Sequence, residues 1–308
     1  MNTPRFGLIG DPIGTSLSPA LFRAAYGGTL DYDLIEGADF EQSWQRFLDD
    51  YQAINVTAPF KEAAFARTVA LAREGKGTVS GPCLKIGATN MLVKGENGIE
   101  AHNFDFTGIL MSVAETLFPG IVQEFIGTYS TRAHIKVHQF FREALPKIYP
   151  EKPQALIVGT GGAGKAAAVA AAELGYATVL MNRTPDKAAA FSARLPEYGF
   201  LVDPMEDFIP AVKECDLVVY TVPAAVPALE KLSADDFAGE KRPGQPAKII
   251  LDANYRIPIF NAQIRQRLSE GKARYIPGTE WLLYQAVSGY GTMTGRPCDV
   301  KAMASFFK

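Results

Sequence analysis

The chain has 308 residues, of which 47% are hydrophobic, and this length allows two domains that each bury a core of their own. Its 31 basic and 33 acidic residues leave a net charge of −2, which gives no global attraction for nucleic acid or for an anionic membrane. Three widely spaced cysteines and three histidines argue against a disulfide framework or a metal site. We therefore expect small-molecule chemistry without a metal.

The amino terminus, MNTPRFGLIGDP, has no basic segment followed by an apolar one, as a secretory signal would have. No apolar run reaches the roughly 18 residues that a membrane span needs. We expect a soluble, cytoplasmic protein, either a monomer or a homodimer, whose partner is a small-molecule substrate and not nucleic acid or a membrane.

The first hundred residues alternate short apolar runs with amphipathic ones, which predicts an α/β layer with a mixed sheet. The helix after the first strand has Ser18 as the expected N-cap and Gly27 as the expected stop. We assign residues 1–110 to this first domain. In chain order, the expected elements are a strand at 5–10, helices at 18–28 and 40–50, a strand at 51–59 and a hairpin with strands at 90–94 and 99–103.

Residues 111–153 are expected to be a linker with an extended insertion. Their composition from Pro119 to Pro153 predicts one amphipathic helix and reveals no chemistry.

A regular series of strands and helices begins at Gln154 and predicts a doubly wound, Rossmann-type domain over residues 154–285. A final helix at 278–295 is expected to lead back, so that residues 286–308 pack on the first domain. The expected strands of the second domain are QALIVG, ATVLMN, CDLVVYTV and KIILDAN.

The loop at 159–165 follows a strand and precedes an alanine-rich helix, and it fits two phosphate-binding motifs. A P-loop for ATP needs a hydroxyl after Lys165 to coordinate magnesium, but that position is Ala166. The dinucleotide motif has no such gap, because Gly159 permits the turn, Gly161 lets the backbone approach a pyrophosphate and Gly164 allows close packing of the helix on the strand. The dinucleotide interpretation is favoured.

The end of the next strand distinguishes the two nicotinamide cofactors. NAD enzymes usually have an acidic residue there, whereas this chain has Asn182, Arg183 and Thr184, followed by Lys187. A guanidinium can hold a 2′-phosphate and stack on adenine, which favours NADP. The alternative is a solvated cationic turn.

Two hydroxyl residues, Ser16 and Ser18, lie between the first strand and its helix. Ser18 alone is explained as a helix cap. Two hydroxyls beside a helix amino terminus can also bind a carboxylate.

Asn55 and Thr57 alternate along the strand at 51–59, and Lys61 follows at the start of the next helix. A lysine in this position is usually a surface charge. Near a substrate carbonyl, however, it can act as a proton donor and acceptor.

Asn90 and Asp105 lie on or just beyond the expected hairpin. Asp105 is also well placed to be the N-cap of a helix that starts near Phe106. Considered alone, the capping role is the simpler explanation.

Together these motifs, in this order, resemble the shikimate dehydrogenase family over nearly the whole chain. The resemblance implies that Lys61 and Asp105 form the catalytic pair and that NADPH reversibly reduces 3-dehydroshikimate to shikimate across a cleft between the domains. The other residues that it implies for substrate binding are Ser16 and Ser18 at the carboxylate, Thr57, Asn90 and Gln285 at the ring hydroxyls, and Asn55 and Tyr255 lining the site.

The resemblance also implies the residues of an NADP site. The family's pyrophosphate loop corresponds to Gly159, Thr160, Gly161, Gly162 and Ala163, and its 2′-phosphate turn corresponds to Asn182, Arg183, Thr184 and Lys187. The strand end beside the nicotinamide corresponds to Thr221 and Val222, and the contact with the nicotinamide carboxamide corresponds to Gly278.

Two departures from the family pattern affect the expected substrate. Phe104 and Met91 stand where the family usually has threonine, so two hydroxyls near the expected site are missing. Oxidation of quinate or of a related polyhydroxycyclohexane carboxylate remains an alternative. Alternatives of other classes are an ATP-dependent enzyme that uses the loop at 159–165 and a non-catalytic NADP-binding regulatory protein.

Overall fold

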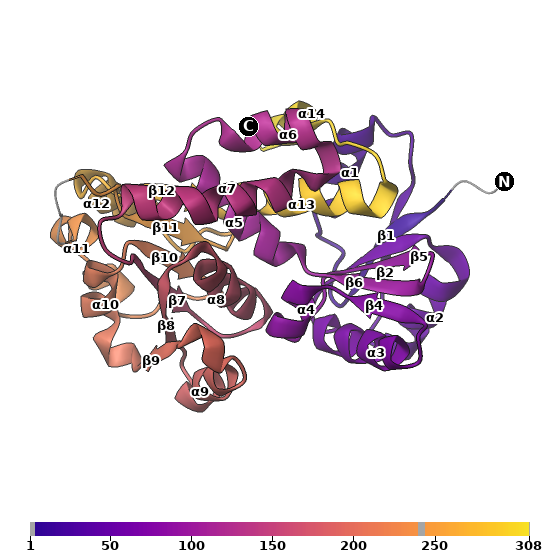
Figure 1. Ribbon diagram of the computed structural model, residues 1–308, viewed down its shortest axis with the longest axis horizontal. Coiled ribbons are helices and arrows are strands. Elements are labelled where there is room, and N and C mark those ends of the chain that lie inside the picture. The colour runs from indigo at the N-terminus through magenta and orange to yellow at the C-terminus, as the bar shows by residue number, and fades with distance from the viewer. Residues whose placement is uncertain (1–3, 240–243, 308) are drawn as a thin grey trace. The chain divides into compact units, whose positions relative to one another are not determined.

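A computed structural model of the protein describes residues 4–239 and 244–307. The chain divides into two compact units, and each is a separate α/β layer structure. The first unit comprises Met1–Thr107 and Gln285–Lys308, and the second comprises Gly108–Tyr284. Figure 1 labels most of the helices and strands of both units.

The first unit contains a six-stranded mixed sheet in the order β2-β1-β3-β5-β6-β4. β1 is parallel to both of its neighbours, whereas β5 is antiparallel to β3 and β6, so the expected mixed sheet and its hairpin are confirmed. The strands are β1 Phe6–Gly10, β2 Tyr32–Glu36, β3 Ala53–Val56, β4 Gly77–Val79, β5 Met91–Gly95 and β6 Gly98–His102.

The helices of this unit surround the sheet. They are α1 Ser18–Tyr26, α2 Phe40–Asp50, α3 Lys61–Arg73, α4 Gly81–Ile86 and α14 Val300–Ser305. The chain leaves the unit within α5, Phe104–Leu117, and returns within α13, Gly278–Thr294. The expected return of the C-terminal residues to the first unit is therefore confirmed.

The two faces of this sheet differ in character because side chains alternate along each strand. Ile9, Ile35 and Ile54 point to one face and join Trp44 and Phe47 of α2 in a buried apolar cluster. The side chains of Phe6 and Tyr32 point to the opposite face of the sheet. Their rings contact Phe22 of α1, which in turn contacts Tyr290 of α13. One face is thus an ordinary core, and the other carries hydroxyl-bearing aromatic side chains.

The start of α1 differs from the expected one by a single residue. The helix begins at Ser18, and Leu17 is its N-cap residue, so the N-cap role expected for Ser18 is wrong. The Oγ of Ser16 instead accepts the Ser18 N–H at 3.2 Å, because Ser16 lies just before the first turn. The expected stop is confirmed, since Gly27 ends the helix with a left-handed φ of 62°.

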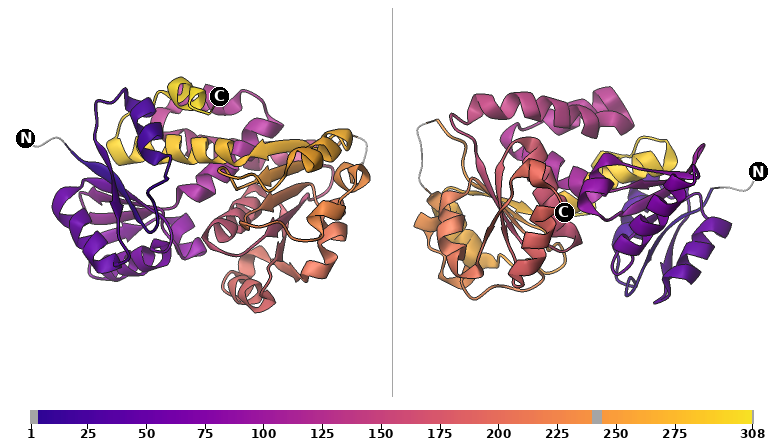
Figure 2. Two further views of the ribbon diagram at one scale, coloured as in Figure 1. Left: turned by 180° about the vertical axis from the view of Figure 1, so that it is seen from behind. Right: turned by 60° about the horizontal axis from the view of Figure 1, so that its bottom comes forward.

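The second unit contains a six-stranded parallel sheet in the order β12-β11-β10-β7-β8-β9, and helices cover both of its faces (Figure 2). The strand order reverses direction at β7, as in a doubly wound fold, which confirms the expected Rossmann-type sheet. The strands are β7 Gln154–Val158, β8 Ala177–Met181, β9 Leu201–Asp203, β10 Leu217–Tyr220, β11 Ile249–Asp252 and β12 Arg274–Pro277. The sequence did not predict β9 and β12, which are short edge strands.

The remaining helices of the second unit connect these strands or precede them. Those between the strands are α8 Gly162–Leu174, α9 Pro185–Ala193, α10 Phe208–Glu214, α11 Ala234–Ala238 and α12 Ala262–Glu270. Two more helices, α6 Ile121–Tyr129 and α7 Ala133–Ile148, precede β7, where one was expected. The break between them falls at Ser130, whose φ is positive, and rings such as Phe125 and Phe140 pack the two helices together.

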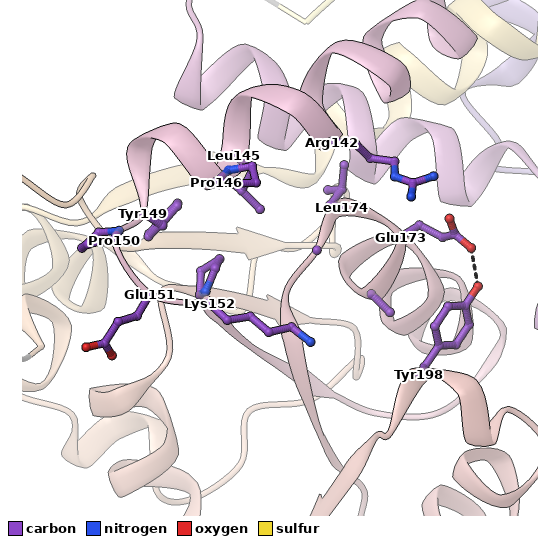
Figure 3. Close-up of a pocket in the computed structure, with 13 residues that line it drawn as sticks. Arg142, Leu145, Pro146, Tyr149, Pro150, Glu151, Lys152, Glu173, Leu174 and Tyr198 are labelled. Atoms are coloured by element: carbon purple, nitrogen blue, oxygen red, sulfur yellow. Dashed lines mark hydrogen bonds between the residues drawn. The ribbon is translucent and has the colours of Figure 1, made fainter.

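The C-terminal ends of α7 and α8 border a cavity of about 690 Å³ (Figure 3). Leu145 and Leu174 are among its lining residues, with Arg142 and Lys152 also on its wall. None of the residues predicted to bind substrate or cofactor lines it. The inserted helices therefore form a surface feature of the second unit that is separate from the predicted binding residues.

Within residues 4–239 and 244–307, none of the helices combines the length and the apolar character that crossing a bilayer requires.

Candidate active site

A lysine and an aspartate from different helices form the most closely paired group among the predicted site residues. Lys61 is the first residue of α3, and Asp105 lies in the first turn of α5. The Nζ of Lys61 lies 2.5 Å from Oδ2 of Asp105, and their side chains are 21% and 4% exposed. The pair is thus largely shielded from water, yet the ammonium retains access to a ligand.

Asp105 is not the N-cap of α5, so the capping role considered for it is wrong. Two asparagines satisfy the first N–H groups of the helix instead. The Oδ1 of Asn90 accepts the N–H of Phe104 at 2.8 Å, and the Oδ1 of Asn103 accepts the N–H of Phe106 at 3.3 Å. The Asp105 carboxylate is held by the side chains of Lys61 and Asn90.

Asn90 is the residue that fixes Asp105 from the side opposite Lys61. It is 7% exposed, and its Nδ2 donates to Oδ1 of Asp105 at 3.0 Å. Its backbone N–H donates to the carbonyl of His102, and its own carbonyl accepts the N–H of Val56. Asn90 therefore connects the ends of β3 and β6 to the Asp105 carboxylate.

The imidazole of His102 lies beside this group and stacks on the Phe104 ring at a centroid distance of 5.7 Å. Burial lowers the pKa of His102, although the neighbouring Glu100 opposes this effect. We therefore expect a neutral imidazole at pH 7.

Polar groups predicted to bind substrate occupy the aromatic face of the sheet. The hydroxyls of Ser16 and Ser18 lie 3.1 Å apart, and the half-buried Asn55 accepts a hydrogen bond from Tyr32 at 2.8 Å. Thr57 directly follows β3, where its N–H donates to the carbonyl of Ile9.

Helix α13 contributes the side-chain amide of Gln285 and, at Gly289, a stretch of backbone that two other side chains approach closely. The Oε1 of Gln285 is buried and has no hydrogen-bond partner among the described residues, so it is an unsatisfied acceptor. One turn later, a Cβ on Gly289 would lie 2.8 Å from the Met91 Cε and 3.4 Å from the Phe104 ring. Met91 and Phe104 therefore both pack against the backbone of α13 at Gly289.

The glycine loop of the second unit has the geometry that the dinucleotide motif predicts. Gly159 has a φ of 97°, and a Cβ on Gly164 would overlap the carbonyl oxygen of Gly159. A Cβ on Gly161 would meet nothing within 4 Å, so the backbone there is open to a ligand. Helix α8 begins at Gly162, directing its free N–H groups toward the loop. Ala163 is in the same first turn.

A polar group in this loop also lacks a partner within the described part of the chain. The Oγ1 of Thr160 is buried and makes no hydrogen bond, while its backbone N–H donates to Oδ1 of Asn182 at 3.2 Å. The Nδ2 of Asn182 donates to the carbonyl of Thr184 at 2.8 Å, which shapes the turn after β8. Arg183 and Lys187 are exposed on this turn. The arrangement fits a phosphate group with an additional anionic group beside it.

The other predicted cofactor residues border the same loop or lie near the ends of the neighbouring strands. Thr221 donates to the carbonyl of Val158 at 2.8 Å, and a Cβ on Gly159 would touch both Thr221 and Val222. At the β11 and β12 ends, a Cβ on Gly278 would lie 2.8 Å from the Tyr255 nitrogen. Tyr255 therefore belongs to the second unit, whereas the other predicted substrate residues belong to the first.

Across the residues that the structure describes, no group of three or more His, Cys, Asp or Glu side chains could hold a metal ion.

Tyr32 was not among the predicted site residues, and the capping role of Asn103 was not predicted. The pattern of YDLIE gives no sign that the tyrosine hydroxyl meets Asn55, because the contact crosses an intervening strand. Asn103 could have been found, since asparagine immediately before a helix is a strong N-cap signal.

These features define a class of protein: a two-unit α/β dehydrogenase with a dinucleotide-binding sheet in one unit and a lysine–aspartate pair in the other. A sequence model described as shikimate / quinate 5-dehydrogenase matches residues 144–254. Over these residues the chain is similar to the shikimate dehydrogenase family.

Similar proteins extend the likeness over the whole chain. The shikimate dehydrogenase (NADP(+)) of Thermus thermophilus is 27% identical, covering 97% of this chain and 95% of that protein. The pentafunctional AROM polypeptide of Candida tropicalis is 28% identical over 97% of this chain, which spans only 18% of that polypeptide.

Solved structures give the same result for the fold. The crystal structure of shikimate 5-dehydrogenase from Thermus thermophilus in complex with shikimate has a TM-score of 0.70 and 26% identity, and it covers 99% of this chain and 98% of its own. Quinate dehydrogenase from Corynebacterium glutamicum in complex with NAD has a TM-score of 0.72 at 20% identity, with the same coverage of both chains. The second likeness concerns the fold alone.

Proposed function

We propose that the protein catalyses the reversible, NADP-dependent interconversion of shikimate and 3-dehydroshikimate, a step toward chorismate and the aromatic amino acids. The observation that carries this proposal is the Lys61–Asp105 pair, shielded and held by Asn90. Relatives named shikimate dehydrogenase (NADP(+)) support the choice of substrate and cofactor. We assign proton transfer and, apart from Tyr255, substrate binding to the first unit and cofactor binding to the second.

A bound NADP would supply the redox chemistry, the oxidised form as hydride acceptor for the substrate alcohol and the reduced form as hydride donor to the ketone. The open backbone at Gly161, the Thr160 hydroxyl and the first turn of α8 would hold its pyrophosphate. Arg183 and Lys187 would bind the 2′-phosphate, with Asn182 and Thr184 shaping their turn. Thr221, Val222 and Gly278 would lie at the nicotinamide end.

Lys61 moves the proton in this proposal. During reduction the carbonyl oxygen gains negative charge, and the ammonium stabilises that charge and donates a proton to it. During oxidation the amine accepts the hydroxyl proton. Asp105 holds the amine in place through a charge-assisted hydrogen bond, and Asn90 holds Asp105.

The remaining polar residues orient the substrate. Ser16 and Ser18 would donate hydroxyl hydrogen bonds to the substrate carboxylate, and the free Oε1 of Gln285 would accept one from a ring hydroxyl. The others that we assign to the substrate are Asn55, Thr57, Asn90 and Tyr255.

The decisive experiment measures the initial rate of NADP⁺ reduction with shikimate in the purified protein, then repeats it with NAD⁺. We expect turnover with NADP⁺ and a strong preference for it over NAD⁺. The variant Arg183→Ala should lose most of that preference, whereas Arg194→Ala, an exposed arginine in the same unit, should keep it. Absence of turnover with every substrate and cofactor would overturn the proposal in favour of a non-catalytic NADP-binding protein.

A second candidate substrate is quinate. The observation in its favour is that Met91 and Phe104 place apolar groups beside Asn90 and Asp105, against Gly289. A substrate ring that meets an apolar side chain should carry different substituents from one that meets a side-chain hydroxyl. The ratio of kcat/KM for shikimate to kcat/KM for quinate decides between the two substrates. A ratio below one would show that quinate is the principal substrate.

A further inference from the structure

The hydroxyl of Tyr32 lies at the centre of a hydrogen-bond group that includes two predicted substrate residues. Tyr32 is on β2, at one edge of the sheet, and Asn55 is on β3, with β1 between them. The phenol reaches across β1 so that its oxygen lies 2.8 Å from Oδ1 of Asn55. This contact joins two strands that do not pair with each other.

The direction of this hydrogen bond is fixed by chemistry. Burial raises the pKa of Tyr32 well above 10, and the nearby hydroxyl of Tyr290 raises it further, while a hydrogen bond from Ser18 opposes this. The phenol is therefore protonated at neutral pH and can donate. An amide oxygen can only accept, so Tyr32 must donate to Asn55.

The orientation of the Asn55 amide follows from this donation. With Oδ1 directed at Tyr32, the Nδ2 is directed away, and it donates to the carbonyl of Asn90 at 3.3 Å. An amide nitrogen has two hydrogens, and within the described residues no second acceptor meets it. Asn55 is half-buried, so it presents an N–H donor, and not a carbonyl, to a ligand on this face of the sheet.

Tyr32 also packs beside a residue that binds the backbone near the serine pair. The centroids of the Tyr32 and Tyr290 rings lie 6.0 Å apart, and the Tyr290 hydroxyl donates to the Ser18 carbonyl at 3.2 Å. The Ser18 hydroxyl lies 3.1 Å from that of Ser16. Tyr32 therefore packs on Tyr290, which binds the Ser18 backbone, and hydrogen-bonds to Asn55, which links onward to Asn90.

We propose that Tyr32 is a positioning residue for substrate binding: its hydroxyl locks the Asn55 amide so that an N–H faces an oxygen of the substrate. This inference rests on the proposed function, because the substrate whose oxygens are bound is the polyhydroxylated carboxylate. Without the Tyr32 hydroxyl, the amide can turn over and offer a carbonyl where a donor is needed.

The test is the variant Tyr32→Phe, which keeps the ring and its packing against Phe22 but removes the hydroxyl. Loss of one neutral hydrogen bond predicts a KM for shikimate, and a dissociation constant by calorimetry, raised about fivefold. The kcat and the KM for NADP⁺ should stay close to the wild-type values, because Lys61 and the nucleotide loop are untouched.

The matched control is Tyr26→Phe. Tyr26 belongs to the same aromatic cluster, but its hydroxyl contacts Thr294 and the Tyr290 carbonyl, neither of which is a predicted substrate residue. Its KM for shikimate should equal that of the wild type. Equal KM changes in Tyr26→Phe and Tyr32→Phe would indicate general loosening of the cluster and would overturn the proposal.

A double-mutant cycle with Asn55→Ala tests whether Tyr32 acts through Asn55. If it does, removing the Tyr32 hydroxyl from the Asn55→Ala protein should cause little further rise in the dissociation constant. Fully additive effects would show that Tyr32 does not act through Asn55. Failure of the proposed function is distinguishable from either outcome, because the wild-type protein would then neither turn over nor bind shikimate.

Discussion

The Lys61 ammonium and the Asp105 carboxylate, from the first turns of two different helices, lie 2.5 Å apart. Asn90 occupies the other carboxylate oxygen, so the aspartate has a neutral partner on one side and a charged partner on the other. This arrangement fixes the position of the lysine amine without neutralising its capacity to exchange a proton with a ligand.

Replacing Lys61 with methionine should remove proton transfer while preserving side-chain volume. We expect kcat for shikimate oxidation to fall by about 10²–10⁴-fold, the usual contribution of a general acid or base, with a much smaller change in KM. Steady-state kinetics measure both parameters. Lys76→Met, an exposed lysine paired with Glu74, is the control and should behave as wild type. A Lys61 variant with near-normal kcat would exclude this residue from catalysis.

Asn90→Ala should destabilise the first unit as well as reduce activity. The substitution removes the hydrogen bonds that Asn90 makes to the Phe104 N–H and to one Asp105 oxygen, both in a buried environment. The expected loss in unfolding free energy is about 2 kcal/mol or more, measured by urea denaturation. Gln52→Ala removes an exposed amide that donates to the Lys94 carbonyl, and its cost should be within about 0.5 kcal/mol. Similar values for the two variants would contradict the structural role of Asn90.

The two glycines Gly161 and Gly164 should respond differently to alanine. A methyl at Gly164 collides with backbone, so Gly164→Ala should destabilise the second unit by about 2 kcal/mol or more. A methyl at Gly161 meets nothing, so Gly161→Ala should keep the wild-type melting temperature. It should nevertheless raise the dissociation constant for NADP⁺ at least about tenfold, because the methyl blocks charge-assisted contacts to the pyrophosphate. A Gly161→Ala protein with unchanged NADP⁺ affinity would place the pyrophosphate elsewhere.

The carboxyl of Glu280 should make stability depend on pH. Burial, with a smaller contribution from Glu115, raises its pKa from 4.5 to about 7. Between these values the folded protein keeps a proton that the unfolded chain has lost, so stability falls as pH rises from about 5 to about 7 and is constant above that range. The difference corresponds to at most about 3 kcal/mol.

Glu280→Gln, which mimics the protonated form, should remove this dependence. Calorimetric melting of the variant and the wild type should coincide near pH 4 and separate in favour of the variant at pH 8. Glu197→Gln, an exposed glutamate in the same unit, should follow the wild-type curve throughout. A variant that melts below the wild type at pH 8 would show that the ionised carboxylate is stabilising.

Local signals were sufficient to predict much of the fold. The hairpin, the doubly wound sheet and the end of α1 at Gly27 each depend on neighbouring residues, such as a turn between apolar runs or a glycine after a helix. The edge strand β9 has only three residues, too few to show a hydrophobic period. The break at Ser130, which divides the insertion into two helices, has no glycine or proline to mark it.

The candidate site was predictable as a set of residue types but not as a set of contacts. Lys61 and Asp105 could be named as a catalytic pair because the motifs around them resemble those of the shikimate dehydrogenase family, whereas their contact depends on how α3 and α5 pack in the first unit. Considered alone, Asp105 was better explained as a cap, but Asn103 makes a capping hydrogen bond to this helix. The substrate and cofactor roles of the other residues stay predictions.

The shared contact of Met91 and Phe104 with Gly289 has a consequence for protein engineering. Because both side chains fill the space beside one glycine, shortening either of them opens a void that the other must occupy. Their effects on substrate preference should therefore be epistatic. A library that varies the two positions together, with Gly289 kept, samples specificities that no series of single exchanges would reach.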